Sequence, residues 1–434
     1  MSEPLGTEPP VTLPVDETSR ARLAARGLRL STVDHSDVAA VEKWLRVEYR
    51  GFLSPHPSQE LLDGARAYQD DRRMTGVYDD ALGDAGPVAT SAAWVGDLTV
   101  PGGTTLPSWL ISGVTVSPTH RRHGIATAML EAELRTAASL DLPLAILTVS
   151  ESTIYHRFGF GPATVLTGWE IDTKRIRWRG RDVTGRIAYA DPAEFRATGR
   201  AVLDRIRRAR IGEIAKTPVL ADRLIGPLPG DPKKDDYRLV RFDDGNGECQ
   251  GFLSYSLTGD DADFAMHTLE VRHLAAATDD AYLALWRFAL EHDLVGLVKT
   301  FTAGDDEPLP LLVSDFRRAR QTWREDHLWA RILDVPRALA SRSYERDGSI
   351  VFGIDDPLGF ASGSWRLTVT DGAGAVERTA DAPDVSLAVT ALGSLYLGGM
   401  SARHLALRGE VTGDAGRLDA LFRTSAPPHF GSWF

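Results

Sequence analysis

Apolar and polar residues alternate along the first 150 residues with the two periods that mark strands and helices. A half-buried strand is predicted at residues 28–32. A helix is predicted at 37–49, with Val38, Val41, Leu45 and Val47 on its inner face. Further strands are predicted at 74–78, 88–95, 109–116 and 144–149, and further helices at 58–68 and 125–139. This order of elements predicts a mixed α/β sheet domain, with residues 166–178 as its last strand.

A short basic loop joins the strand at 109–116 to the helix at 125–139. Pro118 ends the strand, and Arg121, Arg122 and Gly124 precede the helix. The free N–H groups and the positive dipole end of a helix start favour an anion, and Gly124 lets the backbone approach it. The spacing is neither Gly-x-x-x-x-Gly-Lys nor Gly-x-Gly-x-x-Gly, so an anion site of another kind is predicted. The alternative is a basic helix start that only faces solvent.

Composition narrows the possible partners. The 434 residues are 43% hydrophobic, enough for a large core divided over two or three domains. A net charge of −11 disfavours nucleic acid and anionic membranes and favours a cationic small substrate. Cys249 is the only cysteine, so neither an intrachain disulfide nor a thiolate metal cluster is expected.

The N-terminal residues and the lengths of the apolar runs indicate the cellular compartment of the protein. No apolar run reaches the ~20 residues of a membrane helix. The acidic, Pro-rich residues 1–20 are expected to be a mobile tail and not a signal peptide. A cytoplasmic protein is therefore expected.

The middle of the chain repeats the first order of elements without the basic loop. A hairpin is predicted at 237–241 and 251–256, followed by a strand at 264–274, a helix at 279–292 and a strand at 297–302. Asp279 and Asp280 stand at this helix start, where they would repel a pyrophosphate. We expect a second domain of the same fold with an architectural role. The arginine-rich helix at 192–211 is expected to be a solvated face, because no aromatic residues interleave with its charges.

From Leu328 onward the pattern changes again. The run 328–339 predicts a helix. Strands at 349–354, 363–370 and 375–379 follow, with helices near 384–392 and 414–421.

Two motifs carry a family resemblance. Arg121-x-x-Gly124-x-Ala126 resembles the signature of the GCN5-related N-acetyltransferases (GNAT), in which this loop holds the pyrophosphate of acetyl-coenzyme A. The segments 116–124 and 150–163 resemble the enhanced intracellular survival (Eis) branch of that family. The resemblance implies an α/β (α+β) fold: two GNAT-like mixed-sheet domains in tandem, then a sterol carrier protein-like domain. The expected division is a tail (1–20), a catalytic GNAT domain (21–175), a degenerate GNAT-like domain (176–320) and the sterol carrier protein-like domain (321–434), assembled as a homohexamer.

The resemblance also implies which residues bind acetyl-coenzyme A. They are Val114, Thr115, Val116, Arg121, Arg122, His123, Gly124, Ile125, Ala126, Thr127, Ser150 and Glu151. Tyr155, just past a strand end, is expected to protonate the departing thiolate. The implied base is the carboxylate of Phe434, which burial would make more basic. Glu48, Phe52 and Trp433 are candidates for the acceptor pocket.

The predicted reaction is direct acetyl transfer to a primary amine in a ternary complex. A lysine-type amine has a pKa of about 10.4, so only about one molecule in 2,500 is free at pH 7, and a base is needed. Aminoglycosides, polyamines and lysine side chains stay open as acceptors. Trp433 departs from the acidic residue that aminoglycoside-accepting members often carry before the terminal aromatic residue. The alternative is a non-catalytic protein that binds acyl-coenzyme A or a lipid on the same scaffold.

Overall fold

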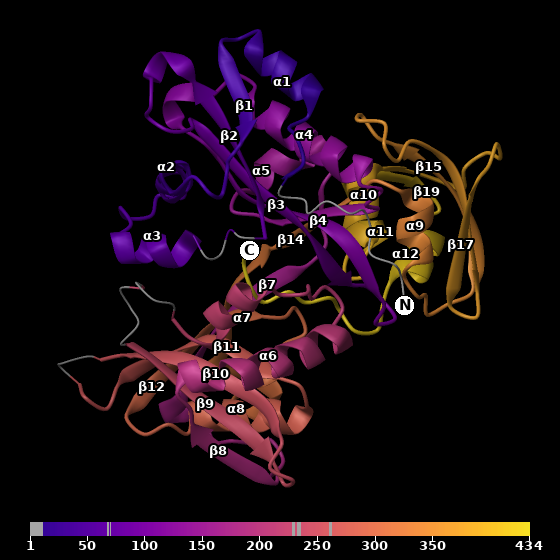
Figure 1. Cartoon of the computed structure of the whole chain (residues 1–434). Helices are drawn as coiled ribbons and strands as arrows, with labels where there is room; N and C mark the ends of the chain where they lie inside the picture. Colours follow the sequence, from indigo (N-terminus) through magenta and orange to yellow (C-terminus); the bar gives the residue numbers. More distant parts are fainter. Residues whose placement is uncertain (1–11, 67–68, 70, 228–230, 232–235, 260–262) are drawn as a thin grey trace.

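The computed structural model describes residues 12–66, 69, 71–227, 231, 236–259 and 263–434. Within these residues the strands form three sheets, of seven, seven and five strands. The sheets belong to three domains that meet near the centre of the molecule, where the C-terminal residue lies (Figure 1). The predicted class, two mixed α/β domains in tandem followed by a third α/β domain, is confirmed.

The first sheet is built mainly from residues 28–163. In spatial order its strands are β1 (Leu28–Thr32), β2 (Arg73–Asp79), β3 (Ala89–Thr99), β4 (Thr105–Val116), β5 (Leu144–Thr148), β14 (Leu328–Ile332) and β6 (Gly161–Pro162). Its helices are α1 (Glu17–Ala24), α2 (Val38–Gly51), α3 (Gln59–Arg66), α4 (Ile125–Ser139) and α5 (Ser152–Tyr155). The pair β4–β5 is parallel and the other pairs are antiparallel. Helix α4 packs on this sheet through Leu130, Leu134 and Ala137, which belong to one apolar cluster with Trp109 and Leu147.

Three α-helices accompany the second sheet in the described part of this domain. In spatial order its strands are β13 (Ala319–Asp326), β7 (Val165–Asp172), β12 (Val295–Ala303), β11 (His267–Ala276), β10 (Cys249–Thr258), β9 (Tyr237–Asp244) and β8 (Gly185–Tyr189). The helices are α6 (Pro192–Ala209), α7 (Pro218–Ile225) and α8 (Asp279–Leu290). On the arginine-rich helix α6, Arg200 pairs with Asp222 and Arg205 with Glu248.

The first two sheets exchange strands, which the sequence pattern did not predict. Residues 165–172, expected to end the first domain, form β7 and pair with β12, with Asp172 opposite Leu297. Residues 328–332, predicted to begin a helix, form β14 and pair with β5, with Leu328 opposite Thr148. A short, mostly apolar run suits either a helix or a strand, and here pairing with the open edge of β5 makes it a strand.

The third domain has a smaller sheet and a filled interior. In spatial order its strands are β17 (Ala373–Arg378), β16 (Gly363–Thr370), β15 (Gly348–Asp355), β18 (Val385–Ala388) and β19 (Val411–Gly413). Its helices are α9 (Val335–Ala340), α10 (Val389–Leu395), α11 (Ala402–Leu407) and α12 (Ala415–Phe422). Phe352, Tyr396 and Phe422 fill the space between them and are fully buried. The buried ion pair of Arg331 with Asp356 (2.7 Å) ties β14 to this domain.

The structure also differs from the expectations for the N-terminal region. Residues 1–11 of the predicted tail lie outside the described residues. Helix α1 begins at Glu17, inside that tail, because Asp16 caps it and pairs with Arg135 of α4 (2.8 Å). Val38, predicted on the inner face of its helix, is 46% exposed because it begins the first turn of α2. None of the described helices is both long and apolar enough to cross a membrane.

Candidate active site

Strands β4 and β5 separate before the basic loop begins. They are paired only from Trp109 to Ile111 of β4, and β4 then continues to Val116 without β5 beside it. A bulge lies at Gly113, where the register of β4 against β3 shifts and φ is +60°, a conformation that favours glycine. The predicted donor-binding residues Val114, Thr115 and Val116 all lie in this separated stretch. Their backbone is therefore accessible from the side that β5 has left.

The basic loop leads from the open end of β4 into α4. Gly124 is the N-cap of this helix, in a left-handed conformation, and no side chain caps the helix start. The first N–H groups of α4, at the predicted residues Ile125, Ala126 and Thr127, thus keep donors for an anion. Arg121, Arg122 and His123 are exposed beside it.

Arg26 adds a cation that sequence reasoning missed. Its guanidinium donates a hydrogen bond to the carbonyl oxygen of His123. It comes from the end of α1, so no local motif connects it to the loop. The donor set and the charge of this loop suit a pyrophosphate.

Tyr155 ends helix α5 beside the separated strands. The residue is 6% exposed and its ring lies 6.2 Å from that of Phe160. Burial, with a smaller effect of Glu151, raises the pKa of Tyr155 to about 12, so the side chain is a neutral phenol at pH 7 and a proton donor.

The two predicted donor-binding residues before Tyr155 differ in position. Ser150 lines the same cavity as Tyr155. Glu151 is exposed and accepts a hydrogen bond from Thr153 Oγ1 (2.7 Å). Glu151 is the residue before the first turn of α5, and its side chain does not cap that helix.

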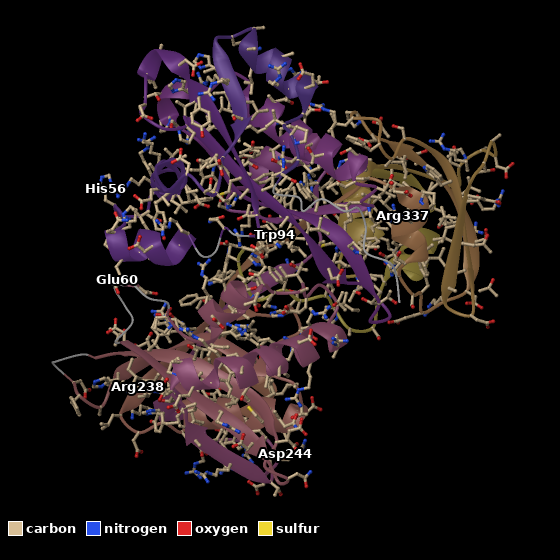
Figure 2. All side chains as sticks on the ribbon, viewed as in Figure 1. His56, Glu60, Trp94, Arg238, Asp244 and Arg337 are labelled. Atoms are coloured by element: carbon tan, nitrogen blue, oxygen red, sulfur yellow. The ribbon has the colours of Figure 1, made fainter. Side chains whose placement is uncertain are left out.

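The C-terminal segment brings Phe434 from the third domain into the first. Beyond α12 the chain runs without regular structure, and the ring of Phe434 packs edge-on against Trp94 at 5.3 Å. Trp94 lies in the middle of the molecule, where the domains meet (Figure 2). Thr148 Oγ1 donates a hydrogen bond to a backbone oxygen of Phe434 (3.4 Å), which places this terminus at the end of β5.

His327 holds this segment just before its end. Its Nε2 donates a hydrogen bond to the carbonyl oxygen of Ser432 (2.7 Å), and its ring stacks on Phe430 at 5.6 Å. Burial lowers the pKa of His327 to about 4, so the imidazole is neutral at pH 7. Since a carbonyl can only accept, the single ring proton is on Nε2.

These elements surround a cavity of about 560 Å³. Tyr155 and Phe434 line it together with Val114 of the bulge. The predicted acceptor residues Glu48, Phe52 and Trp433 line it as well, and the last two are about half exposed. Sequence reasoning missed several polar lining residues, among them Gln69, Arg72 and Arg223.

Glu48 is the acidic side chain of this cavity whose pKa is shifted most. Burial raises the pKa of Glu48 to about 7, although Arg72 and Arg223 lower it. A carboxylate oxygen of Glu48 lies 2.7 Å from the point where a Cβ at position 113 would stand. Gly113 therefore makes room for this carboxyl beside the bulge.

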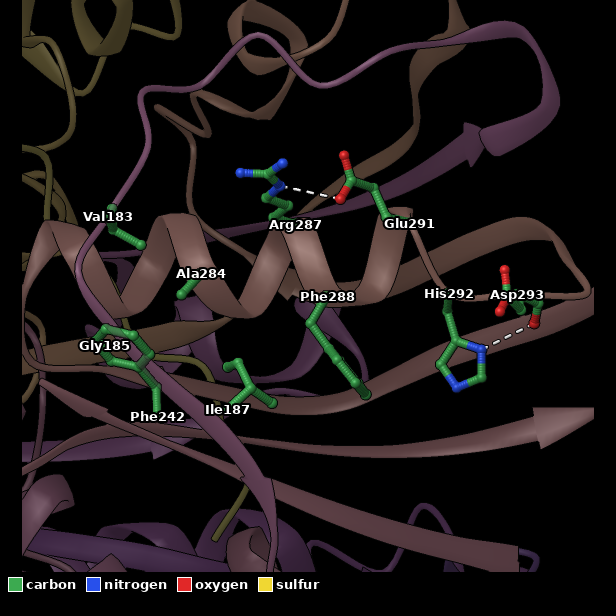
Figure 3. Close-up of a pocket in the computed structure, with 10 residues that line it drawn as sticks. All are labelled: Val183, Gly185, Ile187, Phe242, Ala284, Arg287, Phe288, Glu291, His292 and Asp293. Carbon is green, nitrogen blue, oxygen red and sulfur yellow. Dashed lines mark hydrogen bonds and ion pairs between the residues drawn. The ribbon is translucent and has the colours of Figure 1, made fainter. Parts of the chain in front are cut away.

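The second domain has a different hollow, of about 520 Å³, between β8, β9 and α8 (Figure 3). Its Arg287 pairs with Glu291 (3.0 Å), and its His292 contacts the carbonyl oxygen of Asp293 (2.9 Å). Helix α8 is capped by its own Thr278, whose side chain accepts a hydrogen bond from Ala281 N (3.2 Å). The helix start that corresponds to α4 is thus already occupied by a side chain.

Separated parallel strands, an uncapped basic helix start and a buried tyrosine beside a cavity are features of an acyltransferase of the GNAT class. Family models agree, since residues 33–163 and 217–335 each match an acetyltransferase (GNAT) domain and residues 335–431 match a sterol carrier protein domain. These domains make the protein an N-acetyltransferase that uses an acyl-coenzyme A as donor.

Individual relatives narrow the class. The chain is 36% identical over 416 residues to an N-acetyltransferase of Streptomyces avermitilis, which covers 92% of this chain and 98% of the relative. It is 34% identical over 366 residues to the N-acetyltransferase Eis of Mycobacterium tuberculosis, covering 81% of this chain and 87% of Eis. The crystal structure of Eis1 from Mycobacterium abscessus matches with a TM-score of 0.79 and 30% identity, over 93% of this chain and 100% of that chain. The protein belongs to the Eis family of N-acetyltransferases.

Proposed function

We propose that this enzyme transfers an acetyl group from acetyl-coenzyme A directly to a primary amine in a ternary complex. The observation that carries the proposal is one cavity lined by Tyr155, by the bulge at Val114 and by the carboxylates of Glu48 and Phe434. An amide-forming reaction needs an oxyanion site, an acid for the thiolate and a base for the ammonium. Groups of all three kinds meet in this cavity.

The donor is held by its phosphates and its thioester. The pyrophosphate lies on Arg121, Arg122 and the first N–H groups of α4, while backbone groups of residues 114–116 meet the pantetheine arm and the thioester carbonyl. The amine nitrogen attacks the carbonyl carbon, the C–N bond forms, and the C–S bond breaks. Tyr155 gives its proton to the departing sulfur, and its raised pKa keeps that proton in place until then. The second proton, which the nitrogen loses as the amide forms, restores the phenol of Tyr155.

The carboxylate of Phe434 takes the proton that the ammonium loses. The hydrogen bond from Thr148 and the packing of the ring on Trp94 support this role, because they hold the terminus beside the ends of β4 and β5. Glu48, Phe52 and Trp433 hold the acceptor. Aminoglycosides, polyamines and lysine side chains are the starting panel, and the functional assembly is a homohexamer, which light scattering tests.

Replacing Tyr155 by Phe tests the proposal. The variant keeps the buried ring but loses the acid, so kcat for thiol release is expected to fall about 10²-fold. The Kd for acetyl-coenzyme A, measured by calorimetry, is expected to stay the same. An unchanged kcat contradicts the acid role, and a folded wild-type enzyme that releases no thiol with any amine contradicts acetyl transfer itself.

The filled interior of the third domain gives no support to the alternative of a lipid-binding protein. Its apolar side chains occupy the space between sheet and helices.

A further inference from the structure

Arg72 is a buried cation in the acceptor cavity that has no ion-pair partner among the described residues. It is 8% exposed, and its Nε has no hydrogen-bond partner. The guanidinium lies over the ring of Trp94, 4.1 Å from the centroid, and lines the cavity. Arginine is rarely buried without a paired anion, since desolvation of the charge is costly. A cation in this state has donors left for a ligand in the cavity.

Three neighbours share the lining with Arg72 and extend its polar surface. Gln69 is 5% exposed, and its Oε1 has no hydrogen-bond partner. Arg223 reaches the cavity from α7 of the second domain. Asp231 adds a carboxylate to the same lining. This part of the acceptor cavity therefore combines two guanidinium groups with the carboxylate of Asp231 and an amide oxygen that has no hydrogen-bond partner within the described residues.

Glu48 supplies the opposite charge in the same cavity. It lies beside Gly113 of the bulge, where the thioester carbonyl is expected. Arg72 and Arg223 are near enough to influence its ionisation, yet neither forms an ion pair with it in the described part of the chain. Positive and negative groups that line one cavity but stay apart can be bridged by a ligand that carries both charges.

We propose that the acceptor is an amine that also carries a carboxylate, as an amino acid does. Its ammonium lies at Glu48 beside the bulge, and its carboxylate lies on Arg72, with Arg223 as a second cation. A planar guanidinium binds a carboxylate through two parallel N–H···O hydrogen bonds, which gives the site its selectivity. The product is an N-acetyl amino acid and free coenzyme A. This inference rests on the proposed function and names the substrate class of the same site. A polycation would instead place a second positive charge near Arg72.

Matched pairs of acceptors isolate the carboxylate. Phenylalanine is compared with 2-phenylethylamine, and lysine with 1,5-diaminopentane, since each pair differs by one carboxylate. Thiol release at saturating acetyl-coenzyme A gives kcat/KM for wild type and for Arg72→Met. The variant is expected to lose about 10- to 100-fold with the amino acid and to change little with the decarboxylated amine. The different basicity of the two amines is the same for both enzymes and cancels in this comparison.

Two further variants distinguish binding of the acceptor carboxylate by Arg72 from a merely structural role of that residue. Arg207 is also 8% exposed and has a side-chain nitrogen without a partner, but it lies on α6 and pairs with Asp204. Arg207→Met is therefore expected to keep the wild-type preference. Arg223→Met, at an exposed position, tests the second cation if Arg72→Met does not fold, and is expected to reduce the same preference.

Two results overturn the inference: a wild-type preference for the decarboxylated amines, or an equal loss for both members of a pair in Arg72→Met. The second result would mean that Arg72 only supports Trp94. If no acceptor releases thiol, acetyl transfer itself fails. In that case, the rise in Tm caused by coenzyme A together with each acceptor tests the preference for a carboxylate without relying on activity. A larger rise with the amino acid supports it, and an equal or smaller rise refutes it.

Discussion

The carboxyl group of Glu48 makes the acceptor step depend on pH. Burial raises its pKa from the usual 4.5 to about 7. Arg72 and Arg223 face it as cations and lower the pKa, Tyr49 is its neighbour on α2, and Asp231 lines the same cavity. Glu48 therefore changes charge within the range in which enzymes of this kind are assayed.

The effect can be calculated from this pKa. About one tenth of Glu48 is ionised at pH 6 and about nine tenths at pH 8. If the ionised carboxylate holds the acceptor ammonium, the competent fraction of enzyme rises about tenfold over this range. Deprotonation of the amine also speeds the reaction, but equally in a Glu48→Gln variant. The ratio of wild-type to variant kcat/KM, from thiol release at saturating acetyl-coenzyme A, is expected to rise about tenfold from pH 6 to pH 8 and then to level off. A constant ratio refutes the role of Glu48.

Thermal unfolding gives an independent check on the same variant. A carboxyl group whose pKa is higher in the folded than in the unfolded state stabilises the fold only while it is protonated. Its contribution is complete below about pH 4.5 and is lost as the pH rises through about 7, and a rise of this size corresponds to about 3 kcal/mol. Glutamine does not ionise, so Glu48→Gln is expected to raise Tm more at pH 8 than at pH 5. Equal changes in Tm at both pH values would mean that the pKa is not raised.

Two further predictions concern the C-terminal segment. Replacing His327 by Phe keeps the stacking on Phe430 but removes the N–H donated to Ser432, so kcat is expected to fall about tenfold with an unchanged Kd for acetyl-coenzyme A. His327→Gln, which can still donate, is expected to restore most of the rate, and equal losses in both variants would exclude the hydrogen bond as the cause. Adding one glycine after Phe434 moves the carboxylate by about 3.5 Å, and kcat is expected to fall about 10²- to 10⁴-fold while calorimetry finds the same donor affinity. A kcat within about threefold of the wild type would remove this carboxylate from the mechanism.

Features with local causes were predicted well from the sequence. The predicted helix at 125–139 coincides with α4, because Pro118 and Gly124 mark the end of the strand and the start of the helix. The predicted strands at 74–78 and 109–116 lie within β2 and β4 for a similar reason, since turn residues bound each apolar run. Local sequence features were therefore enough to predict the strand and the helix on either side of the basic loop.

Features that depend on distant contacts were not predicted. The run at 328–332 forms a strand only because the edge of β5 is open to it. Arg72 and Arg73 stand together in a charged run that is typical of a surface, yet both are buried: Arg73 pairs with Glu133 (3.4 Å), and Arg72 lines the cavity. Arg223 reaches the same cavity from another domain. No spacing along the chain indicates such contacts, because only the folded sheets bring these residues together.

The exchange of β7 and β14 has a consequence for biosynthesis. During synthesis, the edge of β5 in the first sheet stays unpaired until residues 328–332 have left the ribosome and can form β14. An exposed strand edge invites pairing with other chains, so this interval is the vulnerable stage of folding. For the same reason, a fragment that ends at residue 163 is not expected to fold into a stable enzyme. It lacks β14, the strand that pairs with both β5 and β6 of its sheet.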